Sequence, residues 1–275
     1  MPRCWAQSLG NCSTTQSMEH YVSANLFDTG RVMLRGFAWC PGEFRIVGVN
    51  SAGANVLCST HNNALSPLDA AAGSIRQTLS GMERVRSDRE ATLRVLGPRS
   101  GFIIKRYTIS GNLLERWAIK CAIGLFSAIR MENELWSSSQ TSPINPPDEI
   151  VNAAFGHSIL QRPMGLWFAQ GIGETATHID GYTLSPLFHT GSTITDERTP
   201  DSEAAEGFVG VLITFLGFRF LIWLSPEPIS PFSPEEGVFF GPGLDAPMYR
   251  PREFVFRQGG LRSQVLTFTW EDTIE

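Results

Sequence analysis

The sequence of 275 residues predicts an α+β protein in three parts. Residues 1–70 are rich in Cys, His, Asn and Ser and show little helical periodicity. Residues 112–130 carry apolar side chains at helical spacing, and from residue 150 onward apolar runs alternate with Gly and Pro. We therefore expect a small loop-rich module at 1–75, a helical, basic segment at 76–136 and a mainly antiparallel β region at 150–275.

Two short strands and a helix are expected in the first region. Runs 33–37 and 44–49 have strand composition and are separated by a Pro41-Gly42 turn. Ser66 precedes Pro67, which suits the cap and first position of a helix running to about residue 80.

The middle region contains the clearest helix, residues 112–130, with one broad apolar stripe and Asn112 as a cap. On it, Glu115, Arg116 and Lys120 favour a solvated face, with phosphate contact as the alternative. Residues 76–106 hold eight basic and three acidic side chains. This segment suits contact with a nucleic-acid backbone, although an ordinary charged helix face explains it equally well.

The third region follows a polar linker at 137–149, and its pattern predicts a sheet of short strands. Its stretch 207–224 is almost long enough to span a membrane, but Arg219 lies inside it and Gly217 divides it. We therefore predict two strands meeting near Gly217 and no membrane span. A membrane-associated protein stays as the lesser alternative.

Charge is distributed unevenly along the chain. Residues 1–150 hold 15 basic and 12 acidic side chains, a net charge of +3, and residues 151–275 hold 7 and 15, a net charge of −8. A polyanion would therefore be bound by the first half only. The first residues lack the apolar segment of a signal peptide, so we expect a cytoplasmic protein with reduced cysteines.

Four potential metal ligands occur in two pairs. Cys4 and Cys12 form the first, and Cys58 and His61 form the second. A tetrahedral Zn²⁺ site takes four N or S ligands from two short turns, and it can stabilise a module that has little core. Cys40 is an alternative ligand, because the seven residues between Cys4 and Cys12 are a longer spacing than zinc sites usually have. The alternative is that these cysteines are small buried hydrophobic residues.

Polar residues with catalytic chemistry lie among these ligands. Glu19-His20 follows the first pair, Asn55 stands three residues before Cys58, and Asn62 follows His61. This order, over about 70 residues, resembles the HNH endonuclease family, whose module is a treble-clef, ββα-metal fold. The resemblance implies that His20 is the general base, that Glu19 and Asn62 hold a catalytic Mg²⁺ or Mn²⁺, and that Asn55 orients the loop.

The chemistry of these residue types agrees with the implied roles. Imidazole titrates near neutral pH and can deprotonate water, and oxygen ligands suit Mg²⁺, which neutralises charge on the phosphate. The chain departs from the family in the long spacing from His20 to Asn55, in His61 where a second Cys is usual, and in lacking a Pro after His20.

The sequence supports two candidate functions. The first is a metal-dependent endonuclease that hydrolyses phosphodiester bonds, with DNA favoured over RNA and bound by the N-terminal half. The alternative is a zinc-stapled binding or interaction protein without turnover, which the acidic C-terminal half favours. In either case the β region is available for a protein partner or for self-association.

Overall fold

The structure is a computed structural model that describes most of the chain. The described residues are 4–27, 30–34, 43, 45–96, 105–131, 146–168, 182–190, 193–195, 208–215, 218–226, 248–258 and 261–270. Cys40, the Pro41-Gly42 turn and Gly217 lie outside them.

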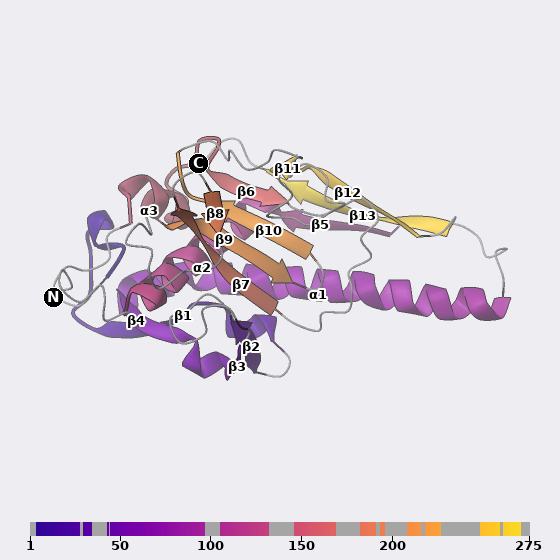
Figure 1. The fold of residues 1–275 in the computed structure, drawn as a ribbon, viewed down its shortest axis with the longest axis horizontal. Coiled ribbons are helices and arrows are strands. Elements are labelled where there is room, and N and C mark those ends of the chain that lie inside the picture. The colour runs from indigo at the N-terminus through magenta and orange to yellow at the C-terminus, as the bar shows by residue number, and fades with distance from the viewer. Residues whose placement is uncertain are drawn as a thin grey trace.

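Three sheets surround a central helix (Figure 1). A two-stranded antiparallel sheet pairs β1 (Gln16–His20) with β4 (Gly53–Cys58). An eight-stranded sheet has the order β11-β6-β10-β9-β7-β2-β3, with β8 also paired to β7. Its strands are β2 (Arg31–Leu34), β3 (Arg45–Gly48), β6 (Gly165–Phe168), β7 (Tyr182–Thr190), β8 (Thr193–Thr195), β9 (Phe208–Phe215), β10 (Phe218–Trp223) and β11 (Met248–Tyr249). The third sheet has the order β12 (Glu253–Gln258), β13 (Leu261–Thr269) and β5 (Lys105–Ser110).

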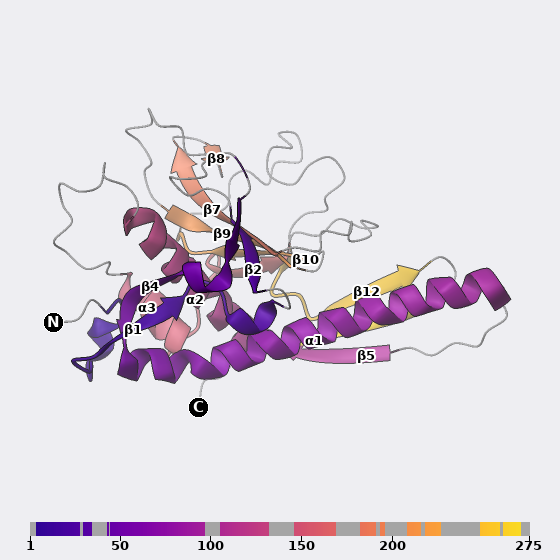
Figure 2. The same ribbon diagram turned by 90° about the horizontal axis from the view of Figure 1, so that it is seen from below.

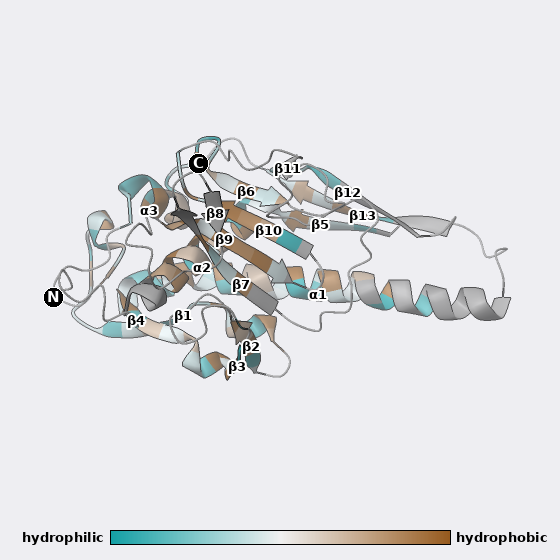
Figure 3. Ribbon diagram, viewed as in Figure 1, coloured by the Kyte–Doolittle hydropathy of each residue, from teal (hydrophilic) through white to brown (hydrophobic). Residues whose placement is uncertain are grey.

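The helices are α1 (Ser59–Leu96), α2 (Gly111–Met131) and α3 (Asp148–Phe155), with 3-10 turns η1 (Gln7–Leu9), η2 (Ala24–Leu26) and η3 (Val49–Ser51). The central helix is α2, which contacts α1, α3 and strands of all three sheets. It matches the expected helix at 112–130, although Ser110 rather than Asn112 caps it, because Ser110 Oγ accepts the Leu113 N–H at 3.2 Å. Hydrophobic residues are concentrated on α2, β9 and β10 (Figure 3).

The helix expected at 66–80 is much longer in the structure. It starts at Ser59, directly after β4, and Pro67 lies inside it. Proline has no N–H for the carbonyl of Asn63, four residues earlier, and the Ser66 hydroxyl donates to that carbonyl at 2.9 Å instead. The Ser-Pro pair is therefore not a helix start. The C-terminal end of α1 projects from the body of the molecule (Figure 2).

The β-rich prediction for residues 150–275 is confirmed for the described part, with α3 as its only helix there. Strands β9 and β10 are antiparallel, with Phe215 paired to Phe218, so the 208–224 stretch is a hairpin around the predicted break. Among the helices of the described residues, none combines the length and apolar composition that a membrane span requires.

The three sequence regions share one core and two of the sheets. Strand β2 of the first region pairs in parallel with β7, as Leu34 does with Leu184. Strand β5 of the middle region pairs in parallel with β13 near the C-terminus. One cluster of buried side chains extends from Cys4 to Phe268. The N-terminal module is thus built into the remainder of the protein.

Candidate metal centre

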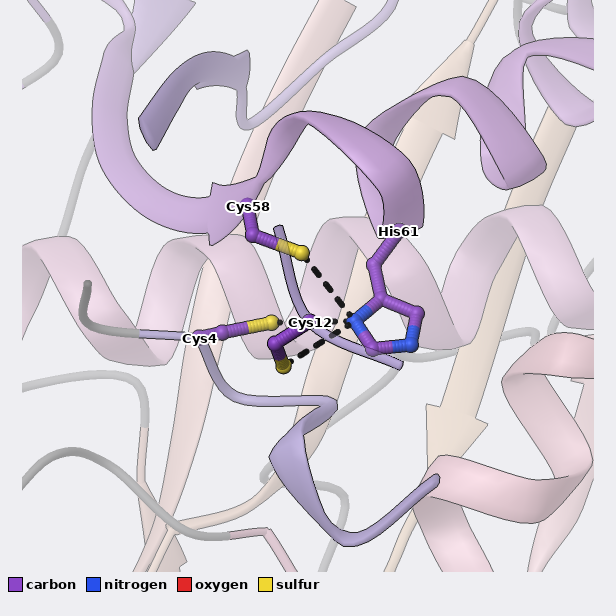
Figure 4. A group of neighbouring side chains, drawn as sticks. All are labelled: Cys4, Cys12, Cys58 and His61. Carbon is purple, nitrogen blue, oxygen red and sulfur yellow. Dashed lines mark hydrogen bonds between the residues drawn. The ribbon is translucent and has the colours of Figure 1, made fainter. Parts of the chain in front are cut away.

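The four predicted zinc ligands converge on one point (Figure 4). Cys4 precedes η1, Cys12 follows it, Cys58 ends β4 and His61 lies in the first turn of α1. Their ligand atoms all lie within 4.8 Å of one another. The sequence prediction of this ligand set is therefore confirmed as a cluster.

The distances within the cluster suit a tetrahedral ion. His61 Nδ1 lies 3.2 Å from Cys4 Sγ, 3.3 Å from Cys58 Sγ and 3.6 Å from Cys12 Sγ. Zn–S and Zn–N bonds of ordinary length at a tetrahedral angle place sulfur and nitrogen about 3.6 Å apart. Three thiols and one imidazole are a donor set that Zn²⁺ prefers over Mg²⁺ or Ca²⁺. The cluster can therefore hold a structural zinc ion.

Burial and hydrogen bonds set the acidity of the three thiols differently. Burial raises the pKa of Cys4 to about 12 and also raises the pKa of Cys12. Burial raises the pKa of Cys58 too, but backbone N–H groups of His61 and Ser13 outweigh it and bring the pKa to about 7. A deprotonated Cys4 therefore needs a cation beside it, which a bound zinc ion provides.

Aromatic residues surround the centre and connect it to the C-terminal half. The Phe155 ring, at the end of α3, meets the His61 ring edge-on at a centroid distance of 5.5 Å. The same ring meets Trp5 edge-on at 5.6 Å. The backbone N–H of Trp5 donates a hydrogen bond to the Val56 carbonyl of β4 at 3.0 Å. Trp5 and His61 are accordingly 3% and 6% exposed.

A β-bulge in β4 lies opposite Met18 of β1. Between the pairs Ser17–Leu57 and Glu19–Ala54, β1 has one residue and β4 has two, Asn55 and Val56. The side chains of β1 therefore alternate regularly across the bulge. Ser17 and Glu19 share one face of β1, and His20 lies on the opposite face.

On the shared face, Asn62 Nδ2 donates to Ser17 Oγ at 2.8 Å, so the first turn of α1 contacts β1 there. His20 Nε2 is buried, and no hydrogen-bond partner reaches it among the described residues. The Asn55 side chain is exposed on β4, while its backbone carbonyl accepts a hydrogen bond from the Gln16 side chain. The structure thus brings Asn62 to β1 but leaves the Asn55 side chain at the surface of β4.

Glu19 lies in a buried ion-pair network that the sequence did not reveal. Lys120 Nζ of α2 is 2.6 Å from Glu19 Oε1 and 2.6 Å from Asp69 Oδ1 of α1. Ser23 Oγ also donates to Asp69 and accepts the Trp117 indole N–H at 2.9 Å. Glu19 is 4% and Lys120 3% exposed.

The pKa values in this network follow from burial and charge. Burial raises the pKa of Glu19 more than the neighbouring Lys120 lowers it. Burial alone would lower the pKa of Lys120, but the carboxylates of Glu19 and Asp69 outweigh it and raise the pKa.

The expectation of a solvated face or phosphate contact for Glu115, Arg116 and Lys120 is wrong. Glu115 receives Arg250 through two hydrogen bonds, at 2.9 and 2.5 Å, and accepts the Leu166 N–H at 2.9 Å. Arg116 donates to the Ala154 carbonyl at 3.1 Å. The charged side of α2 is therefore internal, because elements distant in sequence cover it with opposite charges and carbonyls.

Comparisons of the chain with protein-family models, with curated proteins and with solved structures gave no match. We therefore infer the function from the side chains and their geometry.

Proposed function

We propose that the N-terminal region is a zinc-stapled treble-clef module. Cys4 and Cys12 supply one ligand pair from the η1 turn, and Cys58 and His61 supply the other at the junction of β4 and α1. The two-stranded sheet of β1 and β4 is followed directly by a helix whose first turn carries a ligand, and this is the order of elements in that fold. The zinc ion is structural, since four protein ligands leave no open position for a substrate.

The module serves binding rather than hydrolysis. One observation carries this choice: the Glu19 carboxylate, which the HNH resemblance assigns to the catalytic ion, is buried in an ion pair with Lys120 and faces away from His20. Removing a buried carboxylate from its partner costs about 3–5 kcal/mol. A hydrated Mg²⁺ would have to compensate for that cost before catalysis could begin.

Nucleic acid is the partner that the charge distribution favours. Exposed basic residues occur in the described N-terminal half on the β2–β3 hairpin, at Arg31 and Arg45, and further along at Arg84 and Arg106. Such residues contact phosphates without reading sequence, so binding should weaken steeply as salt rises.

A metal-dependent, HNH-like endonuclease is the second candidate. The observation in its favour is that Asn62 contacts Ser17 on the face of β1 that also carries Glu19, so the two implied metal ligands lie on the same side of the strand. On this proposal His20 takes a proton from water. A Mg²⁺ or Mn²⁺ held by Asn62, and by Glu19 after release from Lys120, would neutralise charge on the phosphate, preferably of DNA.

One experiment separates the two candidates. Zinc-loaded protein is incubated with plasmid DNA, single-stranded DNA and RNA in Mg²⁺ or Mn²⁺, beside His20→Ala, and binding to the same nucleic acids is followed by fluorescence anisotropy in EDTA-free buffer. We expect salt-dependent binding and no cleavage above the His20→Ala level. Cleavage that His20→Ala reduces by about 10²–10⁴ would establish the endonuclease instead. Absence of both binding and cleavage would remove nucleic acid as the partner.

A further inference from the structure

The four ligands of the metal centre differ sharply in exposure. Cys4, Cys58 and His61 are 1%, 0% and 6% exposed, whereas Cys12 is exposed. Cys12 follows Gly10 and Asn11, both with positive φ, of 75° and 52°. This turn leads the chain out of η1 and presents the Cys12 sulfur at the surface. A small solute can therefore reach the centre through Cys12 first.

Ser13, the residue after Cys12, holds the Cys12 loop next to Cys58. The Ser13 backbone N–H bonds to the Cys58 sulfur, and Ser13 Oγ lies 2.8 Å from Ser59 Oγ. Ser13 Oγ further accepts the Thr60 backbone N–H at 3.4 Å. The loop that carries Cys12 is thus docked on the first turn of α1, directly beside Cys58.

Cys58 is placed to act as the resolving cysteine. It ends β4, immediately before α1, and the backbone N–H groups of His61 and Ser13 hold its sulfur beside the loop that carries Cys12. The two sulfurs lie within 4.8 Å, so a modest movement of the exposed Cys12 loop brings them to bonding distance.

We propose that the metal centre is a peroxide-sensitive switch in which Cys12 is oxidised first and Cys58 resolves it, with release of zinc. This inference rests on the proposed zinc centre. The Cys12 thiolate attacks hydrogen peroxide: an S–O bond forms, the O–O bond breaks and hydroxide leaves, giving a sulfenic acid. The Cys58 thiolate then attacks that sulfur, the S–O bond breaks, hydroxide leaves, and a Cys12–Cys58 disulfide forms. The two thiolates supply the two electrons that reduce hydrogen peroxide, and the zinc ion loses two of its four ligands.

Release would affect more than the cluster. Residues 4–12 are joined to α1 through the ion, and Trp5 packs against Phe155 of α3 beside it. Loss of zinc therefore weakens the attachment of the N-terminal segment to both helices. Reduction of the disulfide by a thiol in the presence of Zn²⁺ restores the closed state.

The test begins with the zinc content of the purified full-length protein, which separates the two levels of inference. A chain without zinc would overturn the zinc centre itself. With zinc bound, hydrogen peroxide is added while a chromophoric chelator reports released metal and peptide mass mapping locates disulfides. We expect one zinc ion released per chain together with a Cys12–Cys58 disulfide. Release with intact Cys12, or with a Cys4–Cys58 disulfide, would overturn the switch.

Variants test the order of events. Cys12→His keeps a zinc ligand that peroxide does not oxidise, and we expect its zinc release to be slower by about tenfold or more. Cys121→Ser, which removes a buried thiol outside the cluster, is the matched control and should behave as wild type. Equal release rates in Cys12→His and wild type would contradict the proposal. If Cys12→His does not bind zinc, a sulfenic-acid probe on wild type decides: first labelling at Cys12 supports the switch, and first labelling at Cys4 or Cys58 overturns it.

Discussion

Lys120 is a buried lysine between two carboxylates, and its removal leaves Glu19 charged without a partner in the interior. We therefore expect Lys120→Met to lower the free energy of unfolding by about 3–5 kcal/mol. The double variant Lys120→Met with Glu19→Gln removes both charges and should recover much of the loss. Urea denaturation of the three proteins measures this. A double variant as unstable as Lys120→Met would show that the ion pair is not the cause.

The raised pKa of Lys120 also predicts a dependence on pH. A lysine whose pKa is higher in the folded state than in the unfolded chain stabilises the fold fully below its ordinary pKa, near 10.5, and loses that contribution as pH rises through the folded value. The stability difference between wild type and the double variant should therefore be constant from neutral pH to about pH 10 and shift against wild type above it. Urea unfolding across this range measures the difference, and a shift already complete by pH 9 would contradict it.

Loss of one zinc ligand should remove the metal and destabilise the N-terminal region. Cys58→Ala removes a ligand at the junction of β4 and α1, so zinc should be lost and the N-terminal region destabilised. Cys121→Ala is the control, because it removes a buried thiol outside the cluster, and this variant should keep its zinc. Metal analysis and circular dichroism report both properties. Full zinc content in Cys58→Ala would mean that the cluster is not the binding site.

At the scale of elements, α1 contains a proline that serves no helix start. Pro67 interrupts the hydrogen-bond ladder of α1, and Ser66 compensates by donating to the Asn63 carbonyl. We expect Pro67→Ala to stabilise the protein, by up to about 3 kcal/mol, because alanine restores the missing N–H and a better helix propensity. Ser66→Ala alone should destabilise it by about 1 kcal/mol. Thermal unfolding of both variants tests this, and a destabilised Pro67→Ala would show that Pro67 has a packing role.

The elements also show what can be predicted from sequence and why. The α2 helix and the β9–β10 hairpin were predicted because their periodicity is local. The metal ligands were predicted because few residue types bind zinc and their spacing is restrictive. The partners of Glu19, Glu115 and Lys120 were not, since each lies in a distant element. The bulge of β4 opposite Met18 was not predicted either, because no local pattern indicates it.

At the scale of the molecule, Phe155 joins the metal centre to the C-terminal half. Removal of zinc should therefore loosen α3 as well as residues 4–12, because the Phe155 ring loses an ordered His61 and Trp5 to pack against. Hydrogen–deuterium exchange with and without a chelator measures this, and α3 amides should exchange faster in the zinc-free protein. Protection of α3 unchanged by the chelator would show that the two halves are energetically independent. Phe155→Leu, which keeps an apolar contact, should reduce the coupling.

The parallel pairing of β2 with β7 has a consequence for how the protein is made. Leu34 finds its partner Leu184 only after another 150 residues have been synthesised, which takes about 8–30 s at ordinary rates of translation. The zinc ligands, by contrast, are complete once His61 has left the ribosome. Metal capture can therefore precede the closing of the large sheet, so that the nascent chain already has a folded end before β7 is available to pair with the edge of β2.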